Sequence, residues 1–289
     1  MKLALYYNKI EDSKVQCYLC PHNCIIKPGS TGVCRARANM KGELYSLNYG
    51  KITAIALDPI GKKPLKNFHP GSMILSVGTF GCNLKCSFCQ NWTIAHESFD
   101  ESSDIFDVEP EKLVEKALEL VPSGNIGIAY TYNEPSIWYE FVYDTAKLAR
   151  EKGLRNVLVT NGFISREPLE ELLPYIDAMN IDVKAYTSSF YSSICRSSLD
   201  DVKRTVEISA EKCHVEVTNL IIPGLNDSME EIEELAKWLA SVSHEIPLHL
   251  SRFFPRYKMR DVSPTPRETL FEAKDVAERY LKHVYLGNI

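Results

Sequence analysis

The stretch Cys82-Asn83-Leu84-Lys85-Cys86-Ser87-Phe88-Cys89 carries three thiols at C-x3-C-x2-C spacing. It follows the apolar run 73–77, which is typical of a buried parallel strand, and Gly78 and Gly81 loosen the chain between the two. Three sulfurs this close can bind three irons of one cluster, whereas a single zinc ion usually takes four ligands from two separated pairs. The alternative of three ordinary loop cysteines is disfavoured, because free cysteines are commonly buried singly. The stretch therefore predicts an iron–sulfur cluster with one iron free of protein ligands.

The triplet and its aromatic neighbour Phe88 resemble the signature of the radical S-adenosylmethionine (SAM) superfamily. In that superfamily the free iron of a 4Fe-4S cluster chelates SAM, and an electron from the cluster cleaves the sulfonium to a 5′-deoxyadenosyl radical. Further phrases across nearly the whole chain resemble the radical SAM enzymes of the AmmeMemoRadiSam system, which are relatives of glycyl-radical (pyruvate formate-lyase) activating enzymes. These phrases are Cys-Tyr-Leu-Cys-Pro-His-Asn-Cys (17–24), Lys-Lys-Pro-Leu (62–65), Gln-Asn-Trp (90–92), Thr-Tyr-Asn-Glu-Pro (131–135), Asn-Ile-Asp-Val-Lys-Ala (180–185), Ile-Pro-Gly-Leu-Asn-Asp (222–227) and Ser-Arg-Phe-Phe-Pro-Arg-Tyr-Lys-Met (251–259).

Composition limits the classes of function. At 289 residues with 45% hydrophobic content the chain can bury a full core, and a single α/β barrel of this length is ordinary. A formal net charge of −5 and a pI near 5.9 predict no general nucleic-acid surface, because phosphate binding normally shows as a basic excess. No apolar run approaches the roughly 18 residues of a membrane span, and residues 1–6 lack a signal-peptide core. We therefore expect a cytoplasmic protein without a membrane partner.

A second cysteine group lies in residues 1–70, which we expect to form a small Cys-rich segment ahead of a barrel of residues 71–289. Cys17, Cys20, Cys24 and Cys34 follow C-x2-C-x3-C-x9-C spacing in a turn-rich, helix-poor stretch. They predict a second metal, either structural zinc or an auxiliary iron–sulfur cluster, between which the sequence does not choose. The alternative is a reduced loop that packs its thiols as small apolar groups. Nine clustered cysteines in all favour metal binding over disulfides.

Alternating apolar residues between positions 44 and 60 predict a short strand pair, followed by the basic loop Gly61-Lys62-Lys63-Pro64. Lysines in such a loop usually form a solvated face, and a ligand site is the alternative. The resembling enzymes tend to carry an acid where this chain has Gly61. Any charge pairing that the acid provides is therefore absent or replaced here.

Beyond the triplet, helix-period runs alternate with strand-like runs, an order that predicts right-handed βαβ units and a parallel sheet. The expected strands after 73–77 are 126–130, 156–160, 178–182, 214–218, 248–252 and 284–286. The expected helices are 111–120, 136–152, 168–173, 199–210, 229–242 and one after Pro266. These repeats predict an α/β fold, a partial (βα)6 TIM-type barrel.

The chemistry of such barrels lies at the C-terminal ends of the strands. Polar residues end or follow five successive predicted strands: Asn133, Glu134, Thr160, Asn161, Asp182, Lys184, Thr218, Asn219, His249 and Arg252. Singly, each would more often be a helix cap or a satisfied structural group. Together they predict a binding site for SAM, which presents an amine, a carboxylate, hydroxyls and an adenine.

The resemblance implies roles for several of these residues. Asn133 and Glu134 occupy the place of the Gly-Gly-Glu motif, whose acid or carbonyls receive the SAM amine, although Tyr132 and Asn133 replace its glycines. Asp182 and Lys184 match an Asp-x-Lys pair that contacts ribose and carboxylate. Similarly, 160–163 match a Thr-Asn-Gly turn, and His249 would flank the adenine.

Cys195 lies in the long connection 186–198 after a predicted strand, on the expected active face. It could quench a radical, receive a group or ligate a metal, so Cys195 and Lys184 are the candidate catalytic residues. The alternative for Cys195 is a packed loop thiol.

Three functions remain open at this point. The first is a radical SAM enzyme of the AmmeMemoRadiSam type, which takes electrons from a donor such as a flavodoxin or ferredoxin and modifies an undefined small or macromolecular substrate. The second is an activating enzyme that installs a glycyl radical on a partner enzyme. Such enzymes often carry an extra cluster domain after the triplet, for which 90–107 is too short and lacks cysteine, and this favours the first function. The third is a metal-stapled binding or scaffold protein.

Overall fold

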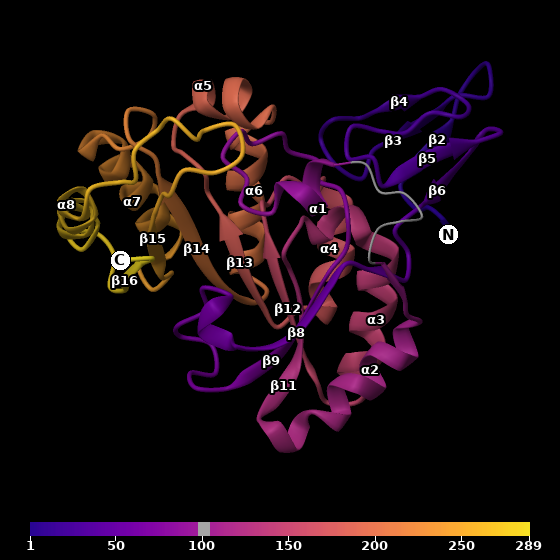
Figure 1. Ribbon diagram of the computed structural model, residues 1–289, viewed down its shortest axis with the longest axis horizontal. Coiled ribbons are helices and arrows are strands. Elements are labelled where there is room, and N and C mark those ends of the chain that lie inside the picture. Colours follow the sequence, from indigo (N-terminus) through magenta and orange to yellow (C-terminus); the bar gives the residue numbers. More distant parts are fainter. Residues whose placement is uncertain (98–104) are drawn as a thin grey trace.

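An eight-stranded sheet forms the centre of the molecule (Figure 1). In the computed structural model, which describes residues 1–97 and 105–289, the strand order is β16-β15-β14-β13-β12-β11-β9-β8. The strands are β8 Ala54–Pro59, β9 Met73–Gly78, β11 Asn125–Tyr130, β12 Arg155–Thr160, β13 Ala178–Asp182, β14 His214–Ile221, β15 Leu248–Arg252 and β16 Val284–Gly287. β8 pairs antiparallel with β9, and every other neighbouring pair is parallel.

Helices alternate with the parallel strands and cover the outer face of the sheet (Figure 1). The longer helices are α2 Pro110–Glu119, α3 Tyr139–Glu151, α4 Arg166–Leu172, α6 Leu199–Ala210, α7 Met229–Ser243 and α8 Arg267–Ala277. Short helical segments are η1 Ile60–Lys62, α1 Trp92–His96, η2 Val121–Ser123, η3 Pro135–Trp138, η4 Leu173–Tyr175, α5 Ser188–Phe190 and η5 Tyr191–Cys195. The predicted partial (βα)6 barrel is thus confirmed. In the described part of the chain its edge strands β8 and β16 do not pair, so the barrel is open on that side.

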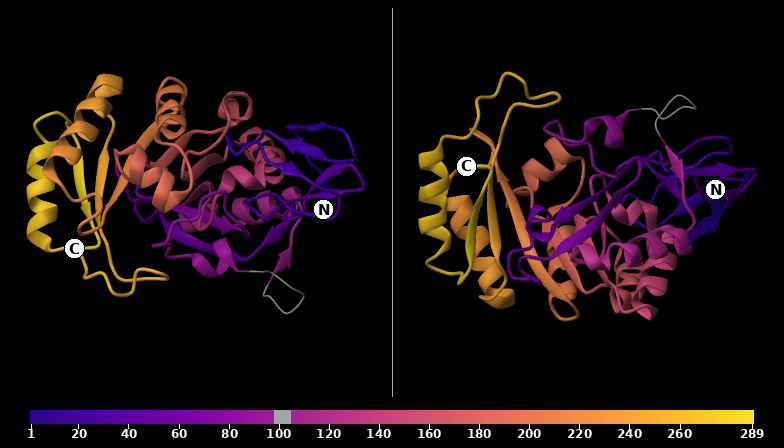
Figure 2. Two further views of the ribbon diagram at one scale, coloured as in Figure 1. Left: turned by 90° about the horizontal axis from the view of Figure 1, so that it is seen from above. Right: turned by 60° about the horizontal axis from the view of Figure 1, so that its bottom comes forward.

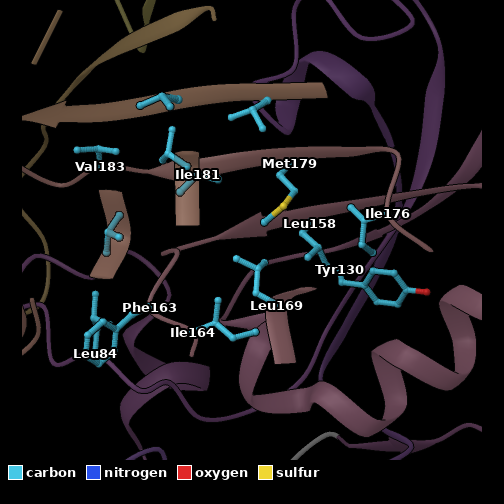
Figure 3. Close-up of a cluster of buried hydrophobic side chains, with 14 of the residues drawn as sticks. Leu84, Tyr130, Leu158, Phe163, Ile164, Leu169, Ile176, Met179, Ile181 and Val183 are labelled. Carbon is cyan, nitrogen blue, oxygen red and sulfur yellow. The ribbon is translucent and has the colours of Figure 1, made fainter. Parts of the chain in front are cut away.

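The core lies between the sheet and the outer helices. Leu158 of β12 and Met179 and Ile181 of β13 point toward Leu169 of α4 (Figure 3), and all four side chains are buried. α6 illustrates how the sequence specifies this layer: Ser198 caps the helix through the Asp201 amide, and an apolar stripe faces the sheet. No helix of the described residues is long and apolar enough to cross a membrane.

The first part of the chain is helix-poor, as predicted, and forms small antiparallel sheets at the end of the molecule opposite the C-terminus (Figure 2). Their strands are β1 Lys2–Leu3, β2 Tyr7–Lys9, β3 Val15–Cys17, β4 Ile25–Ile26, β5 Arg37–Met40 and β6 Glu43–Ser46, and β7 Lys51–Ile52 pairs with β10 Phe106–Asp107.

The predicted strand pair within 44–60 is wrong. β6 pairs with β1 and β5, whereas β8 joins the main sheet beside β9. Alternation shows that a strand has one buried face, but it does not specify the partner. The division at residue 70 stays a prediction; β8 precedes that position in the chain and yet pairs with the barrel strand β9.

Residues 60–72, here called the floor loop, close the interior of the barrel at the N-terminal end of its strands. Ile60 and Leu65 are buried with Ile74, Ala129, Val157 and Ala178, which come from four neighbouring strands. The Asn180 amide donates to the Pro64 carbonyl at 2.9 Å. The Glu216 carboxylate of β14 accepts the Lys66 and Asn67 amides at 2.9 and 2.8 Å. The loop is therefore fixed to the sheet by polar as well as apolar contacts.

Glu216 is fully buried and also accepts hydrogen bonds from His214 at 3.0 Å and His249 at 2.6 Å. Burial alone would raise the pKa of Glu216, but these donors and the two backbone amides lower it to about 2. A carboxyl group whose pKa falls on folding stabilises the protein above its unfolded pKa of about 4.5. That contribution is lost as the pH falls from about 4.5 toward about 2.

We predict that Glu216→Gln lowers the free energy of unfolding at neutral pH and flattens its acid dependence. The pKa difference corresponds to about 3 kcal/mol at neutral pH, from about 1.4 kcal/mol per pKa unit. Urea unfolding at neutral pH and near pH 3 measures the effect, with the exposed Glu151→Gln as the control. A wild type and a Glu216→Gln variant with the same pH dependence would contradict the prediction.

Candidate functional site

A cavity of about 690 Å³ lies inside the barrel, between the C-terminal ends of the strands and the floor loop. This volume is within the usual range for small-molecule sites. Most of the predicted site residues line it together: Cys82, Cys86, Phe88, Cys89, Asn133, Glu134, Thr160, Asn161, Asp182, Lys184, Thr218 and His249.

Asn219 and Arg252, by contrast, lie outside the cavity lining. Asn219 donates to the Val183 carbonyl at 2.8 Å, and Arg252 donates to the Thr265 carbonyl at 2.7 Å. Alternate residues of a strand point to opposite faces, and both residues fall on the helix-covered face. The predicted SAM contacts of these two residues therefore gain no support. The alternation in each strand was a sequence signal that could have excluded them.

The loop that carries the three thiols follows β9 and is held by side chains from neighbouring strands. Asn133 accepts the Thr79 amide at 3.0 Å and donates to the Gly81 carbonyl at 2.9 Å. Gly81 has φ +89°, and a Cβ atom there would lie 2.6 Å from the Cys34 carbonyl oxygen. Only glycine fits this approach between the cluster loop and the N-terminal segment.

Asn83, inside the triplet, continues this network on the opposite side of the loop. Its amide donates to the Phe163 carbonyl at 2.7 Å, and its side-chain oxygen accepts Asn161 at 2.9 Å. The Asn83 carbonyl contacts His22 Nε2 at 2.7 Å. Leu84 packs beside Phe163 (Figure 3). His22 therefore faces the cluster loop rather than solvent.

The three thiols are buried donors whose chemistry fits an iron–sulfur cluster. Burial raises the pKa of Cys82 well above its ordinary value and that of Cys89 to about 11. The hydrogen bond to Cys195 and burial raise the pKa of Cys86. In residues 1–97 and 105–289 no three Cys, His, Asp or Glu side chains are placed to hold one metal ion. A cluster instead needs three sulfurs spread over three irons, so this donor set fits it.

Glu134 is buried and already bound by three donors. One oxygen accepts the Ser136 amide at 2.9 Å and the Thr160 hydroxyl at 2.6 Å, and the other accepts the Asn161 amide at 2.7 Å. Burial raises the pKa of Glu134, and these hydrogen bonds oppose the rise. In this structure Glu134 holds the turn after β12, and its contact with the SAM amine stays a prediction.

Asp182 and Lys184 form an ion pair of 2.6 Å at the end of β13, beside the thiols. The Lys184 amide is fixed by the Tyr191 hydroxyl at 2.9 Å. Burial opposes the charge on Lys184, but Asp182 and Cys86 raise its pKa above the ordinary value. The pair offers both a carboxylate and an ammonium group to a zwitterionic ligand.

Cys195 is fully buried and lies outside the cavity lining, with its Sγ 3.6 Å from Cys86 Sγ. Its carbonyl accepts the Lys85 amide at 2.9 Å. The thiol thus contacts the predicted metal ligand Cys86 and does not line the cavity. A direct catalytic role for Cys195 gains no support from this position.

The four N-terminal thiols Cys17, Cys20, Cys24 and Cys34 line a second, very small cavity of about 10 Å³. Burial raises the pKa of Cys17 and Cys20 above the ordinary value and that of Cys34 to about 11. Arg37, at the edge of this cavity, forms a buried ion pair with Glu140 of α3 at 2.7 Å. This pair fixes the segment to the barrel.

Sequence reasoning missed the side chains that line the cavity from the floor loop. Lys62, Lys63 and Lys66 all contribute to the lining. Lys62 and Lys66 are also solvent-exposed, in agreement with the predicted solvated face, whereas Lys63 is buried. The Tyr132 hydroxyl, which donates to Asp58 at 3.0 Å, joins them. The antiparallel pairing of β8 with β9 brings this loop to the cavity, and no local sequence pattern predicts that pairing.

Comparison with known proteins identifies a family whose sequence profile matches more than half of the chain. The sequence profile of the Radical SAM superfamily matches residues 76–239. An uncharacterized protein of Methanocaldococcus jannaschii is 44% identical over 292 residues, which cover 100% of this chain and 86% of that protein. The pyruvate formate-lyase-activating enzyme of Clostridium pasteurianum is 27% identical over 225 residues, which cover 71% of this chain and 88% of that enzyme.

Solved structures show the same fold at low sequence identity. The crystal structure of Streptococcus suis SuiB bound to S-adenosylmethionine has a TM-score of 0.56 at 13% identity, and the similarity covers 74% of this chain and 51% of SuiB.

We predict that Asn133→Ala loosens the cluster loop, because it leaves the buried Thr79 amide and Gly81 carbonyl without their partner. The free energy of unfolding should fall by about 1–3 kcal/mol. Iron should also be lost faster to a chelator after anaerobic reconstitution, followed by absorbance near 400 nm. The exposed Asn8→Ala is the control. An unchanged rate of iron loss would rule out this role for Asn133.

Proposed function

The chain belongs to the Radical SAM superfamily and is homologous to glycyl-radical activating enzymes, and from this we propose that it is an AmmeMemoRadiSam-type enzyme acting on a substrate in the barrel cavity. As a superfamily member it uses a 4Fe-4S cluster and SAM. The observation that carries the proposal is that Cys82, Cys86 and Cys89 line one end of the same cavity as Asp182 and Lys184. Ligands of the cluster and of SAM thus share one space.

The reaction of this superfamily starts with the transfer of one electron from the cluster to SAM. When bound, the cluster supplies one electron that breaks the sulfonium C–S bond of SAM, giving methionine and a 5′-deoxyadenosyl radical. A hydrogen atom of the substrate would then complete 5′-deoxyadenosine, and the substrate would be left as a carbon-centred radical. The residues of this chain hold the reactants and exclude water while this happens.

The proposed roles follow the positions of the side chains. Cys82, Cys86 and Cys89 hold the cluster, and Phe88 packs beside it within the cavity lining. Asp182 and Lys184 bind the polar groups of SAM. Asn161 supports the cluster loop from β12, since its amide lies 3.7 Å from Cys82 Sγ.

His249 presents its ring to the cavity with Nε2 held by Glu216, which leaves Nδ1 for the adenine or the substrate. Cys195 acts as a positioning residue, because an S–H group next to the Cys86 sulfur can donate a hydrogen bond to a cluster thiolate.

An activating enzyme that installs a glycyl radical on a partner enzyme is the second candidate. The homology to the Clostridium enzyme supports it. The stretch 90–107 weighs against an added cluster domain at that place, because it is short and contains no cysteine. Residues 98–104 of this stretch lie outside the described part of the structure.

The electron donor in this proposal is an acidic carrier such as a flavodoxin or ferredoxin. Lys85 lies within the cluster loop, and the Lys258 amide donates to the Ser87 carbonyl of the same loop at 3.0 Å. Arg35 binds the carbonyls of α1 next to them. In the described ranges no carboxylate pairs with these three cations, so positive charge borders the cluster loop. An acidic carrier complements this surface.

We also propose a second metal at the four N-terminal cysteines. Their side chains line one small cavity in a turn-rich segment, where bound metal can supply folding energy. No three of them are placed to hold one ion in the described structure, so metal binding would bring the thiols closer together. Burial raises the pKa of Cys17, Cys20 and Cys34, and a metal ion would stabilise the thiolate forms that bind it. Zinc and an iron–sulfur cluster remain the two candidates.

We predict that Cys86→Ala abolishes 5′-deoxyadenosine formation and the absorbance near 400 nm, while the barrel stays folded. Two thiolates hold a cluster weakly, and the core does not depend on this side chain. Wild type and variant are reconstituted anaerobically, reduced and incubated with SAM, and the nucleoside is measured by mass spectrometry. Cys213→Ala, at the opposite end of the barrel, is the matched control. Full iron content in the Cys86→Ala protein would refute the assignment.

The second metal is tested in the triple variant in which alanine replaces Cys82, Cys86 and Cys89. We expect about one site per chain of zinc or iron by metal analysis, because the four N-terminal thiols remain. Adding Cys20→Ser and Cys24→Ser should remove this metal and lower the melting temperature. A metal-free triple variant with a stable N-terminal segment would rule the site out.

A further inference from the structure

We propose that the substrate carries an anionic group, a phosphate or a carboxylate, that binds the lysines of the floor loop. This inference rests on the proposed function and names the substrate class for the same cavity. The three thiols follow the C-terminal end of β9, and the floor loop precedes its N-terminal end. The six residues of β9 are separated by five steps of about 3.3 Å, which places the two ends roughly 16 Å apart. The cavity therefore has a thiol end and a lysine end.

At the lysine end, the positive charges of the lysines outnumber the carboxylates that pair with them. Lys62, Lys63 and Lys66 line the cavity there. One carboxylate, Asp58, receives Lys63 at 2.9 Å, Lys62 at 3.3 Å and also the Tyr132 hydroxyl. Lys66 has no carboxylate partner among the described residues. An anion at this place would supply the missing partner.

Gly61, which lies near the Lys66 ammonium group in space, provides no negative charge to balance it. A Cβ atom on Gly61 would lie 4.0 Å from Lys66 Nζ, so an acidic side chain at position 61 could reach it, but this chain has glycine. The other carboxylate near the loop, Glu216, is buried and accepts two histidines and two backbone amides. The ammonium group of Lys66 is therefore available to a ligand.

The backbone of the floor loop and the Lys63 side chain are also held in place before any ligand arrives. Glu216 fixes the Lys66 and Asn67 amides, and Asn180 fixes the Pro64 carbonyl. Lys63 is only 4% exposed, with its ammonium 4.7 Å from the centre of the Tyr132 ring. Lys63 is thus a fixed, desolvated cation, which binds an anion more strongly than a mobile surface lysine because little order is lost and water screens less. Lys62 and Lys66 have solvent-exposed side chains and add positive charge beside it.

In the described part of the chain the edge strands β8 and β16 do not pair, so a ligand can reach this end from the open side of the barrel. Leu286, Gly287 and Asn288 line the cavity on the β16 side, across from the lysines. An elongated small molecule that enters here can place its anionic group on the lysines and a C–H bond toward the thiol end. A glycyl loop of a partner protein has no obligatory negative charge, and the lysines favour a charged small molecule over it.

The test is anion binding to the reconstituted, unreduced holoenzyme, with inorganic phosphate and acetate as separate probes at constant ionic strength. Equilibrium dialysis of labelled probe gives the dissociation constants. The variants are Lys62→Ala, Lys66→Ala and the charge-conserving Lys66→Arg, and the exposed Lys147→Ala of α3 is the control. We expect saturable binding to the wild type, weakened about tenfold by Lys66→Ala, kept within a few-fold by Lys66→Arg and unchanged by Lys147→Ala.

The two probes separate the two anion classes, since tighter binding of phosphate assigns a phosphate-bearing substrate and tighter binding of acetate a carboxylate-bearing one. No saturable binding of either probe, or equal binding by wild type and Lys66→Ala, would overturn the inference. Such a result combined with 5′-deoxyadenosine formation by the wild type leaves the proposed function standing. Absence of that nucleoside from wild-type reactions contradicts the proposed function itself, whatever the anion result.

Discussion

Buried backbone groups must find hydrogen-bond partners, and this constraint shapes the loop that carries the three thiols. The loop follows β9 and belongs to no sheet, so its polar groups are satisfied from outside. Asn133 binds Thr79 and Gly81 from the end of β11, and His22 contacts the Asn83 carbonyl from the N-terminal segment. Elements distant in sequence therefore converge on one short stretch. The partial barrel and the Cys-rich segment both serve to hold it.

The same cavity contains two regions of different electrostatic character. At one end, buried neutral thiols lie beside the Asp182–Lys184 pair, where charge is locally balanced. At the other end, lysines surround the single carboxylate of Asp58. Tyr132 connects the two, since it follows β11 at the thiol end and its hydroxyl reaches Asp58. Its φ of +71° is unusual for a tyrosine and directs the ring across Gly78 into the barrel.

The barrel could be predicted from the sequence because its signals are local. The bounds of β13, β15 and α6 agree with the apolar periodicity, and α6 begins at its serine cap. The pairing of β8 could not be predicted, because a strand pattern does not name its neighbour. The floor loop was missed for the same reason.

Most residues of the candidate site could also be predicted from the sequence, but the contacts between them could not. The Cys triplet and the strand-end polar residues share one cavity, as their positions in the sequence indicate. Asn219 and Arg252 lie on the other face of their strands, which alternation alone distinguishes. The internal hydrogen bonds of Glu134 depend on Thr160 and Asn161, and only the three-dimensional arrangement reveals them.

The docking of the N-terminal segment has a consequence for biosynthesis. Arg37 binds Glu140, which lies 103 residues later in the chain, and the Leu5 amide donates to the same carboxylate 135 residues later. A ribosome must therefore make about half of the chain before the first four cysteines gain their final neighbours. Until then these thiols are in a nascent chain without a core to bury them. Thiols that are still exposed are open to oxidation and to a wrong metal, so the long interval before docking is when these four cysteines are most vulnerable.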